Sequence, residues 1–314
     1  MRALVVSTFS VAVAAAMTCA SAGAQISDAA AIAADPPYTK QTLVLTDIPE
    51  PSGPAIALFN GTDLSGWDKW IGYRDPALTY HQTTERALGK NTSEGASTFR
   101  VVEEDGKPAL YVEGKLWGAL VHKGVYGNYH LRMQYKWGSK KYAPRQDMPE
   151  NNGLLYHSYG KLGSVFGTWM PAVEFEIMRG SVGMAVQVGQ STGIRSYIGH
   201  DADLKLYPYR RYQVGGALAE VALPTYNVEA ASDAERPTGQ WNTLDLYVLG
   251  DRAVHVVNGV PVLAVHDLAV IDGQTKTRTP LTKGHIQLQS EGAETFFRDI
   301  TIEPISSLPK VEVK

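Results

Sequence analysis

GHIQLQSEGAETFFRDITI, residues 284–302, carries an alternating pattern of apolar and polar residues. Ile286 and Leu288 alternate with polar residues, which is the period of a strand with one buried face. After a turn at Glu291-Gly292 the alternation resumes at three apolar positions: Phe296, Ile300 and Ile302. The stretch therefore predicts two antiparallel strands joined by a tight turn.

A second informative stretch, LFNGTDLSGW, occupies residues 58–67 near the other end of the chain. Apolar Leu58 and Phe59 precede the turn formers Asn60-Gly61 and Ser65-Gly66, a pattern typical of a short strand followed by a turn-rich loop. Because the two stretches lie near opposite ends of the chain, we expect an antiparallel sheet to which both ends contribute.

Short alternating segments fill the region between these two stretches. The expected strands are 99–102, 109–112, 119–123, 129–137, 153–159, 172–178, 184–188 and 241–249. A hairpin over 252–265 is expected to turn at Asn258-Gly259, because Asn-Gly accepts the positive φ angles of a tight hairpin turn. Since no segment shows a sustained helical period, the sequence predicts an all-β, antiparallel two-sheet sandwich.

The N-terminal residues have the layout of a cleavable secretory signal. Arg2 precedes an apolar run over 4–17 and the small residues Ala22-Gly23-Ala24. The apolar run is too short for a stable membrane span. We therefore expect a signal peptide over 1–24, cleaved near Ala24, and a periplasmic or secreted protein. A membrane anchor and lipidation at Cys19 remain the alternatives.

The charge balance argues against a nucleic-acid partner. Removal of Arg2 reduces 29 basic residues to 28, which against 32 acidic residues gives a net charge of −4, and no long basic run occurs. Cleavage would also remove the single cysteine, so the mature protein would hold no disulfide and would depend on its core for stability.

Two glutamates on one expected strand are the main candidates for acid–base catalysis. Glu174 and Glu176 are two residues apart on an expected strand, so their carboxylates leave the same face with Cβ atoms roughly 7 Å apart. The intervening apolar residues point the other way. Like charges this close raise the pKa of one partner, which would place an acid beside a base. Two solvated glutamates on an outer strand remain the alternative.

Polar residues on two other strands, and three long connections, complete the candidate site. His157 is in phase with Leu155 on its expected strand, although a lone strand histidine is often structural. Gln287 and Gln289 offer amide groups that can both donate and accept hydrogen bonds. The connections 138–150, 160–171 and 200–240 are long enough to be functional lids. The last, which includes Tyr207, would be either an aromatic wall of a binding site or a packed, salt-bridged insertion.

Five separated motifs occur in a recognisable order along the chain. They are LFNGTDLSGW (58–67), NNGLLYHS (151–158), WMPAVEFEIMRGSVG (169–183), QWN (240–242), and the closing LQSEG and FFRDI. In this order they resemble the 3-keto-disaccharide hydrolase family over roughly 55–304. The resemblance implies a concanavalin A-like jelly roll over 55–308, preceded by a Pro- and Ala-rich extension over 25–54 and followed by a short tail over 309–314.

The resemblance implies chemistry on sugars that are already oxidised at C3. A C3 ketone acidifies the C2 proton, so a base can form an enediolate-like anion that expels the C1 oxygen, after which water adds back. Such a site needs a base, an acid and a group that stabilises the enolate. The implied catalytic residues are Glu174, Glu176 and His157, with Lys136 or Arg132 as the enolate stabiliser.

The resemblance also implies residues that contact substrate or metal. The further substrate-binding candidates are Tyr159, Trp169, Gln287, Gln289 and Glu291. A divalent metal bound by His157 and Glu174 would act as a Lewis acid, although no tight metal-binding spacing is present. The expected partner is a carbohydrate substrate.

Two departures from the family pattern bear on whether the implied activity and specificity are kept. Many relatives carry Gln in place of Glu176, and many have Gly-Asp where this chain has Gly183-Met184. One alternative is a retaining glycosidase of the glucanase type, although the third position of its acidic strand is Met178 here. The other is a non-catalytic carbohydrate-binding module, since a fold alone does not establish catalysis.

Overall fold

The computed structural model describes Ile32, residues 34–222 and residues 225–314. The predicted signal peptide, including Cys19, lies outside the described residues. No helix within the described residues is long and apolar enough to span a membrane. The one short helix that concerns the site is the 3-10 helix η2 (Pro76–Tyr80).

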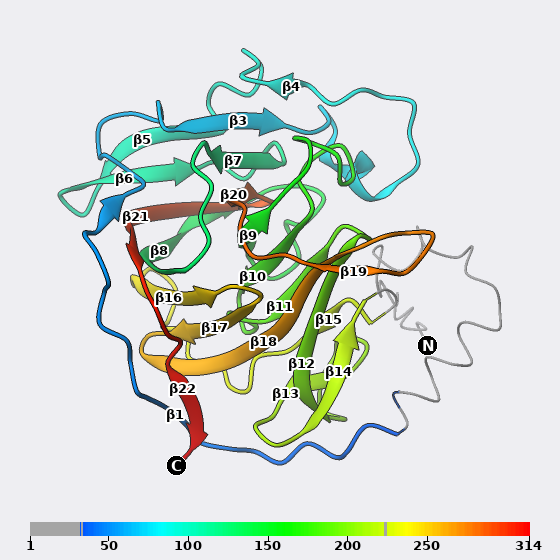
Figure 1. Ribbon diagram of the computed structural model, residues 1–314. Coiled ribbons are helices and arrows are strands. Elements are labelled where there is room, and N and C mark those ends of the chain that lie inside the picture. Colours follow the sequence, from blue (N-terminus) through cyan, green and yellow to red (C-terminus); the bar gives the residue numbers. More distant parts are fainter. Residues whose placement is uncertain (1–31, 33, 223–224) are drawn as a thin grey trace, which may run out of the picture.

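The described strands form two large antiparallel sheets (Figure 1). The smaller one, called the small sheet, has this strand order within the described residues: β15 (Asn227–Val228), β11 (Ala185–Val188), β10 (Ala172–Met178), β9 (Asn151–Ser158), β20 (His285–Ser290), β7 (Gly118–His122), β3 (Trp67–Ile71) and β4 (Gly89–Lys90). Strands from both ends of the chain therefore meet in this sheet, because β7 joins β3 to β20.

The second sheet, called the large sheet, contains the remaining long strands. Its described order is β13 (Arg210–Tyr212), β12 (Thr192–His200), β18 (Val260–Ile271), β17 (Arg252–Val257), β16 (Asn242–Leu249), β8 (Tyr129–Lys141), β21 (Ala293–Pro304), β6 (Lys107–Val112) and β5 (Phe99–Glu104). Three short strands pair beside this path: β14 (Ala217–Val221), β19 (Arg278–Pro280) and β2 (Ile56–Ala57).

The segments that precede and follow the sandwich pair with each other. β1 (Leu43–Thr46) and β22 (Lys310–Val313) form an antiparallel ribbon, which lies near the C-terminus in Figure 1. Leu43 is buried and contributes to the main core. The extended segment before the domain and the last residues of the chain therefore join in one strap.

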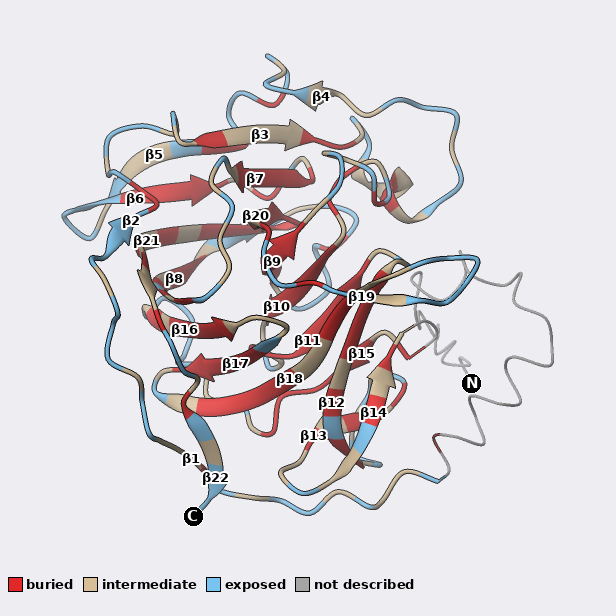
Figure 2. Cartoon of the chain, in the orientation of Figure 1, coloured by how far each residue is buried: buried red, intermediate tan, exposed pale blue. Residues whose placement is uncertain are grey.

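The main hydrophobic core fills the space between the two sheets. On β10 the alternate residues Val173, Phe175 and Ile177 enter this core, and on β8 Leu131 and Met133 do the same. Burial of alternate apolar side chains from two facing sheets supplies the main driving force for this architecture. Figure 2 shows β9, β10 and β20 buried along nearly their whole length. The predicted two-sheet antiparallel sandwich is confirmed.

The hairpin predicted at Asn258-Gly259 is confirmed. Asn258 has φ +50° and Gly259 has φ +82°, and the two residues connect β17 to β18. Both angles lie in the left-handed region that a tight hairpin turn requires. Local turn chemistry therefore fixes this part of the large sheet.

The predicted burial of Phe296 is wrong. Phe297, not Phe296, is fully buried in the main core, because β21 contains a bulge between Arg298 and Thr301 with Asp299 at φ +52°. The extra residue changes the phase of the strand, so that Ile300 also faces the core. Buried and exposed side chains therefore do not alternate strictly across residues 296–302.

The connection over 200–240 is a packed insertion. It contributes three strands that were not expected from the sequence, β13, β14 and β15. The strand before it, β12, was not expected either. Arg210 pairs with Asp35 at 2.6 Å, and Arg211 pairs with Asp201 at 2.6 Å. The salt-bridged alternative for this segment is therefore the one that the structure supports.

Candidate functional site

Glu174 and Glu176 lie side by side on the face of β10 that points away from the main core. In register, Glu174 is opposite Leu155 on β9 and Glu176 is opposite Gly153. The two glutamates are only 4% and 6% exposed, because loops cover this outer face of the small sheet. The alternative of two solvated glutamates is therefore wrong, and the pair is a buried pair of like charges.

Gly153 lets two polar side chains meet across β9. A Cβ atom at this position would lie 2.0 Å from Oε1 of Glu174 and 2.6 Å from Oε1 of Gln289. Glu174 lies on β10 and Gln289 on β20, and β9 runs between these two strands. The absence of a side chain at Gly153 therefore creates the space in which Gln289 hydrogen-bonds Glu174.

A third carboxylate is fixed at the turn between β20 and β21. Oε1 of Glu291 accepts hydrogen bonds from the hydroxyl of Tyr80 at 2.9 Å and from Nη1 of Arg145 at 3.2 Å. Glu291 is 4% exposed and Arg145 is 9% exposed. The next residue, Gly292, has φ +89°, and a Cβ atom there would lie 2.9 Å from Cβ of Arg145. A glycine is therefore needed for the arginine to approach the turn.

These residues form one group, which we call the acid cluster: Glu174, Glu176, Gln289, Glu291, Arg145 and Tyr80. Its members come from β10, β20, the β20–β21 turn, the loop before β9, and η2. Nη2 of Arg145 also lies 4.0 Å from Sδ of Met178, the third position of the acidic face of β10. The loop over 138–150, predicted as a lid, thus contributes the guanidinium of the cluster.

Burial sets the protonation of the acid cluster. Burial, followed by repulsion from Glu176 and Glu291, raises the pKa of Glu174 well above its ordinary value. Burial and the charge of Glu291 raise the pKa of Glu176 to about 8. Burial also raises the pKa of Glu291, while Arg145 and the Tyr80 hydroxyl act to lower it. The cluster therefore retains protons at neutral pH, and it offers an acid beside a base once one carboxyl group of the pair ionises.

An aromatic wall lies next to the acid cluster. Tyr80 contacts the rings of Trp117, Phe166 and Trp169 at centroid distances of 5.7, 5.3 and 5.9 Å. Trp117 and Trp169 stack on each other at 6.2 Å. The loop over 160–171 supplies Phe166 and Trp169. Two of the three connections predicted as lids, 138–150 and 160–171, therefore lie at this face. The sequence-predicted residue Trp169 therefore belongs to the site.

Several buried polar atoms without partners lie around the acid cluster. Of the twelve buried side-chain atoms within the described residues that lack a hydrogen-bond partner, six belong to the cluster or to residues beside it: Oε1 of Glu176, Oε1 of Gln289, Nε of Arg145, Oδ1 of Asn151, Nε1 of Trp117 and Nε1 of Trp169. Each such atom costs about 1–3 kcal/mol when it remains unsatisfied. Their concentration on one face indicates a place for water or for a polyhydroxylated ligand.

The predicted position of His157 in this site is wrong. His157 has φ +51°, and the pairing of β9 with β20 shifts at this point, so the strand bulges. The ring turns into the sandwich, where Nε2 contacts the carbonyl oxygen of Gly250 at 3.0 Å and the ring lies edge-on to Tyr129 at 6.4 Å. Burial lowers the pKa of His157 to about 4, which keeps the imidazole neutral.

Ser158 occupies the position beside the amides instead. Its Oγ accepts a hydrogen bond from Nε2 of Gln287 at 2.7 Å, while Oε1 of Gln287 accepts one from the backbone N–H of Met170 at 3.2 Å. Gln287 lies on the same side of β20 as Gln289, as predicted. Its amide, however, hydrogen-bonds Met170 of the 160–171 loop and so holds this loop on the sheet. Gln289 is thus the amide that borders the acid cluster.

Lys136 and Arg132 also lie away from the acid cluster. Both are on β8, on the side of the large sheet opposite the core residues Leu131 and Met133. Lys136 pairs with Glu104 and Asp105, and Arg132 donates to Oδ1 of Asp245 at 2.9 Å. The prediction that either stabilises an enolate beside Glu174 is therefore wrong, because alternation along β8 directs them to the outer face.

Tyr159 is engaged in structural contacts. Its hydroxyl bonds Oγ of Ser191 at 2.8 Å and Oγ1 of Thr192 at 3.0 Å, and its ring packs against the main core. The predicted substrate contact at Tyr159 is therefore not part of the acid cluster. Glu291, by contrast, lies inside it.

The metal site predicted from His157 and Glu174 is not assembled. The histidine points into the sandwich, whereas the glutamate faces the loops on the other side of the small sheet. Among the residues that the structure describes, there is no group of three or more His, Cys, Asp or Glu residues placed to hold a metal ion. The residues present therefore do not fit the predicted ligand set.

Arg145, Tyr80 and Trp117 were not predicted from the sequence. Arg145 and Trp117 lie in connections and Tyr80 lies in the short helix η2, and none of these segments has a periodic polar pattern of its own. Arg145 is 146 residues from Glu291 in the chain, and Tyr80 is 211 residues from it. The only available signal was the unusual length of the connection that carries Arg145.

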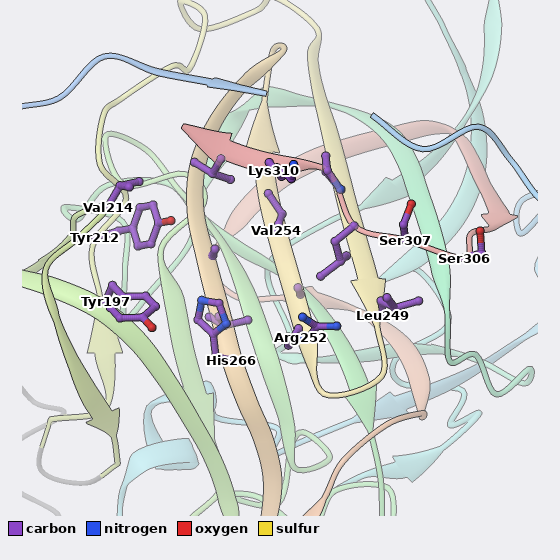
Figure 3. A pocket seen from close by; sticks show the side chains of 17 residues that line it. Tyr197, Tyr212, Val214, Leu249, Arg252, Val254, His266, Ser306, Ser307 and Lys310 are labelled. Carbon is purple, nitrogen blue, oxygen red and sulfur yellow. The ribbon is translucent and has the colours of Figure 1, made fainter. Parts of the chain in front are cut away.

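A separate groove of about 470 Å³ lies on the large sheet beside β22 (Figure 3). Its lining includes Tyr197, Tyr212, Val254 and His266. The groove contains no member of the acid cluster, and its apolar lining borders the C-terminal strap. The buried carboxylates and this surface hollow are therefore different features of the molecule.

Several solved structures are similar to this chain at low identity. A candidate glycosyl hydrolase from Parabacteroides distasonis shares 16% identity, with a TM-score of 0.45, over 80% of this chain and 94% of that one. A Bacillus subtilis protein with a galectin-like fold shares 12% identity, with a TM-score of 0.43, over 83% and 100%. The β-glucanase of Bacillus licheniformis shares 12% identity, with a TM-score of 0.36, over 82% and 100%.

The family comparison is more extensive. No curated protein matches the chain. The 3-keto-alpha-glucoside-1,2-lyase-like domain matches residues 54–303, which is most of the sequence and coincides with the sandwich. The resemblance drawn from the ordered motifs is thereby confirmed. This chain belongs to the 3-keto-alpha-glucoside-1,2-lyase-like domain family, a family of carbohydrate-active proteins.

Proposed function

We propose that this protein is an enzyme that cleaves 3-keto-glycosides by removing the C2 proton and expelling the C1 oxygen. The observation that carries the proposal is the acid cluster, in which buried Glu174 and Glu176 share one face of β10 beside the guanidinium of Arg145. Family membership supports the sugar class. The unpartnered polar atoms around the cluster support a ligand that is rich in hydroxyl groups.

In the first step, the active form of the enzyme is the one in which the Glu174–Glu176 pair has lost one proton and holds one. Its carboxylate takes the proton from C2, and the electrons of the C2–H bond form the C2=C3 bond of an enolate. The C3 oxygen then carries the negative charge. Nε of Arg145 is a buried donor without a partner among the described residues, so it is the group we assign to stabilise this oxygen.

In the second step, the enolate collapses. The C3 ketone forms again, the C1–O bond breaks, and a C1=C2 double bond remains in the sugar. The carboxylic acid of the pair gives its proton to the departing oxygen, so that the leaving group departs as a neutral alcohol. Addition of water across the double bond, with oxygen at C1 and hydrogen at C2, would complete a net hydrolysis.

The stacked indoles of Trp117 and Trp169 supply an apolar boundary for the sugar. Tyr80 connects this wall to the acid cluster through its hydrogen bond to Glu291. An aromatic boundary excludes water, which strengthens the electrostatic interactions inside the site. The loops that carry these residues would have to admit the substrate, because the glutamates are almost fully buried.

We further propose that the protein acts outside the cytoplasm. The apolar run over 4–17 and the small residues Ala22-Gly23-Ala24 support export and cleavage. Sequencing the N-terminus of protein recovered from the periplasm or medium tests this directly. A mature chain that still begins at Met1 would contradict it.

The decisive experiment compares a glucoside with its 3-keto counterpart, with and without a chelator. The proposal predicts release of the aglycone from the ketone only, and exchange of the C2 hydrogen in D₂O. A glycosidase would cleave the unoxidised glucoside, whereas a binding module would cleave neither. The chelator arm tests the metal predicted from the sequence.

Two matched variants locate the chemistry. Glu174→Gln and Glu176→Gln keep the shape of each side chain but remove its titration, so each should lower kcat about 100-fold or more. Lys136→Gln is the control, because its ammonium lies on the outer face of the large sheet. Full activity in the Glu174 variant, with unchanged circular dichroism, would refute the assigned role.

A further inference from the structure

Glu291 is held more firmly than either glutamate of the pair. Two donors from separate loops, the Tyr80 hydroxyl and Nη1 of Arg145, converge on the same oxygen of its carboxylate at 2.9 and 3.2 Å. Its backbone lies in the two-residue turn between β20 and β21, where Gly292 bonds the carbonyl oxygen of Gly114 at 3.0 Å. Glu291 therefore has a fixed position and a fixed counter-ion.

The charged groups that face Glu291 come from every element packed around it. β10 presents Glu174 and Glu176, the 138–150 loop presents Arg145, and η2 presents the phenol of Tyr80. Farther out, Glu229 and Tyr226 interact with Glu176.

The acid cluster holds three carboxyl groups and one guanidinium. Full ionisation would leave a net charge of −2 in a buried site, which is strongly unfavourable. The carboxylate bonded to the guanidinium is the one that best keeps its charge. A proton taken up to reduce this charge therefore resides on the other two carboxyl groups, those of Glu174 and Glu176.

We propose that Glu291 is a positioning residue: its Arg145-bound carboxylate is a fixed anion that makes Glu174 and Glu176 hold one proton between them. The role rests on the proposed function, because a shared proton is what that reaction needs from the pair. Glu291 itself touches neither the C2 proton nor the leaving oxygen. It acts through its charge on the two residues that do.

Removal of this anion has a defined consequence. In Glu291→Gln the amide oxygen still accepts from Tyr80 and Arg145, but the negative charge is gone. The guanidinium then favours ionisation of the pair, so the pair loses its proton at a lower pH. We expect both limbs of the pH profile of kcat/KM, and the alkaline limb most clearly, to move to lower pH by about one unit or more.

A substrate-free titration tests the inference independently of turnover. In protein labelled with ¹³C at the glutamate carboxyl carbon, wild type should show a resonance that titrates near pH 8, and Glu176→Gln should lack or displace it. In Glu291→Gln the remaining titrations of the pair should move to lower pH. The matched control is Glu294→Gln, a buried carboxylate that bonds Tyr111 at 2.7 Å and Lys140 at 3.1 Å instead.

Each outcome is decisive. Unchanged titration in Glu291→Gln would overturn the inference, whatever the enzyme does with substrate. A shifted titration in a protein that leaves 3-keto-glycosides intact would support the inference and refute the proposed function. If Glu291→Gln does not fold, Glu291→Ala replaces it, since this variant removes the same negative charge with a smaller side chain. The same shift to lower pH is then expected, and no shift overturns the inference.

Discussion

Replacement of Glu176 by glutamine should make the protein more stable at alkaline pH. Burial, followed by the charge of Glu291, raises the pKa of Glu176 from its ordinary value of 4.5 to about 8. The folded state therefore retains a proton that the unfolded state has already released. By linkage, stability is complete below the unfolded pKa and declines as pH rises toward the folded pKa.

The size of the effect follows from the same two values. The difference between the unfolded pKa of 4.5 and the folded pKa of about 8 corresponds to a stability difference of roughly 5 kcal/mol, at about 1.4 kcal/mol per pH unit. About 4 kcal/mol of this loss falls between pH 5 and pH 8. Because a domain is typically stable by about 5–15 kcal/mol, the Glu176→Gln variant should differ from wild type by an easily measured amount.

Urea unfolding at pH 5, 6, 7 and 8 measures this difference. The free energy of unfolding of wild type should fall across the series, and that of Glu176→Gln should fall by roughly 4 kcal/mol less. Glu103→Gln is the control, since Glu103 is exposed on β5 and should leave the wild-type trend intact. Parallel trends for wild type and Glu176→Gln would refute the reasoning that burial holds a proton on this side chain.

Three further substitutions test the arrangement of the site and the fold. Gly153→Ala would place a methyl group 2.0 Å from Oε1 of Glu174, so kcat for a 3-keto-glycoside should fall by about tenfold or more while circular dichroism is unchanged. His157→Asn should keep kcat within about twofold, because His157 lies away from the acid cluster and Asn tolerates its positive φ. Loss of the contact to Gly250 should lower the free energy of unfolding by about 1 kcal/mol. Inactivity in a folded variant would contradict this prediction. Gly259→Ala should lower the free energy of unfolding by about 1 kcal/mol in urea, because φ is +82° there.

The strand pattern of this protein could be predicted from short-range features of the sequence. The alternation along 172–178 correctly placed Val173 in the core and Glu174 on the opposite face. The Asn258-Gly259 dipeptide correctly located a hairpin. Both features depend on two or a few neighbouring residues, because the direction of a strand side chain and the φ angles of a turn are local properties.

Alternation failed where a strand bulges. At His157 and at Asp299 the backbone adopts positive φ, and the residues that follow change face relative to a regular strand. A bulge depends on how the strand pairs with its neighbour, so the side-chain period alone does not reveal it. For this reason His157 was assigned to the site, although its ring lies inside the sandwich.

The alternation of residues along the chain is enough to predict a β-sandwich and the side of the strand on which Glu174 and Glu176 lie. It does not predict the groups around them, since Arg145 and Tyr80 reach Glu291 across 146 and 211 residues of chain. Burial of these carboxylates, which raises their pKa values, also arises only when the chain is folded. Side-chain direction along a strand is a local property, whereas burial and charge pairing depend on which distant loops close over the sheet.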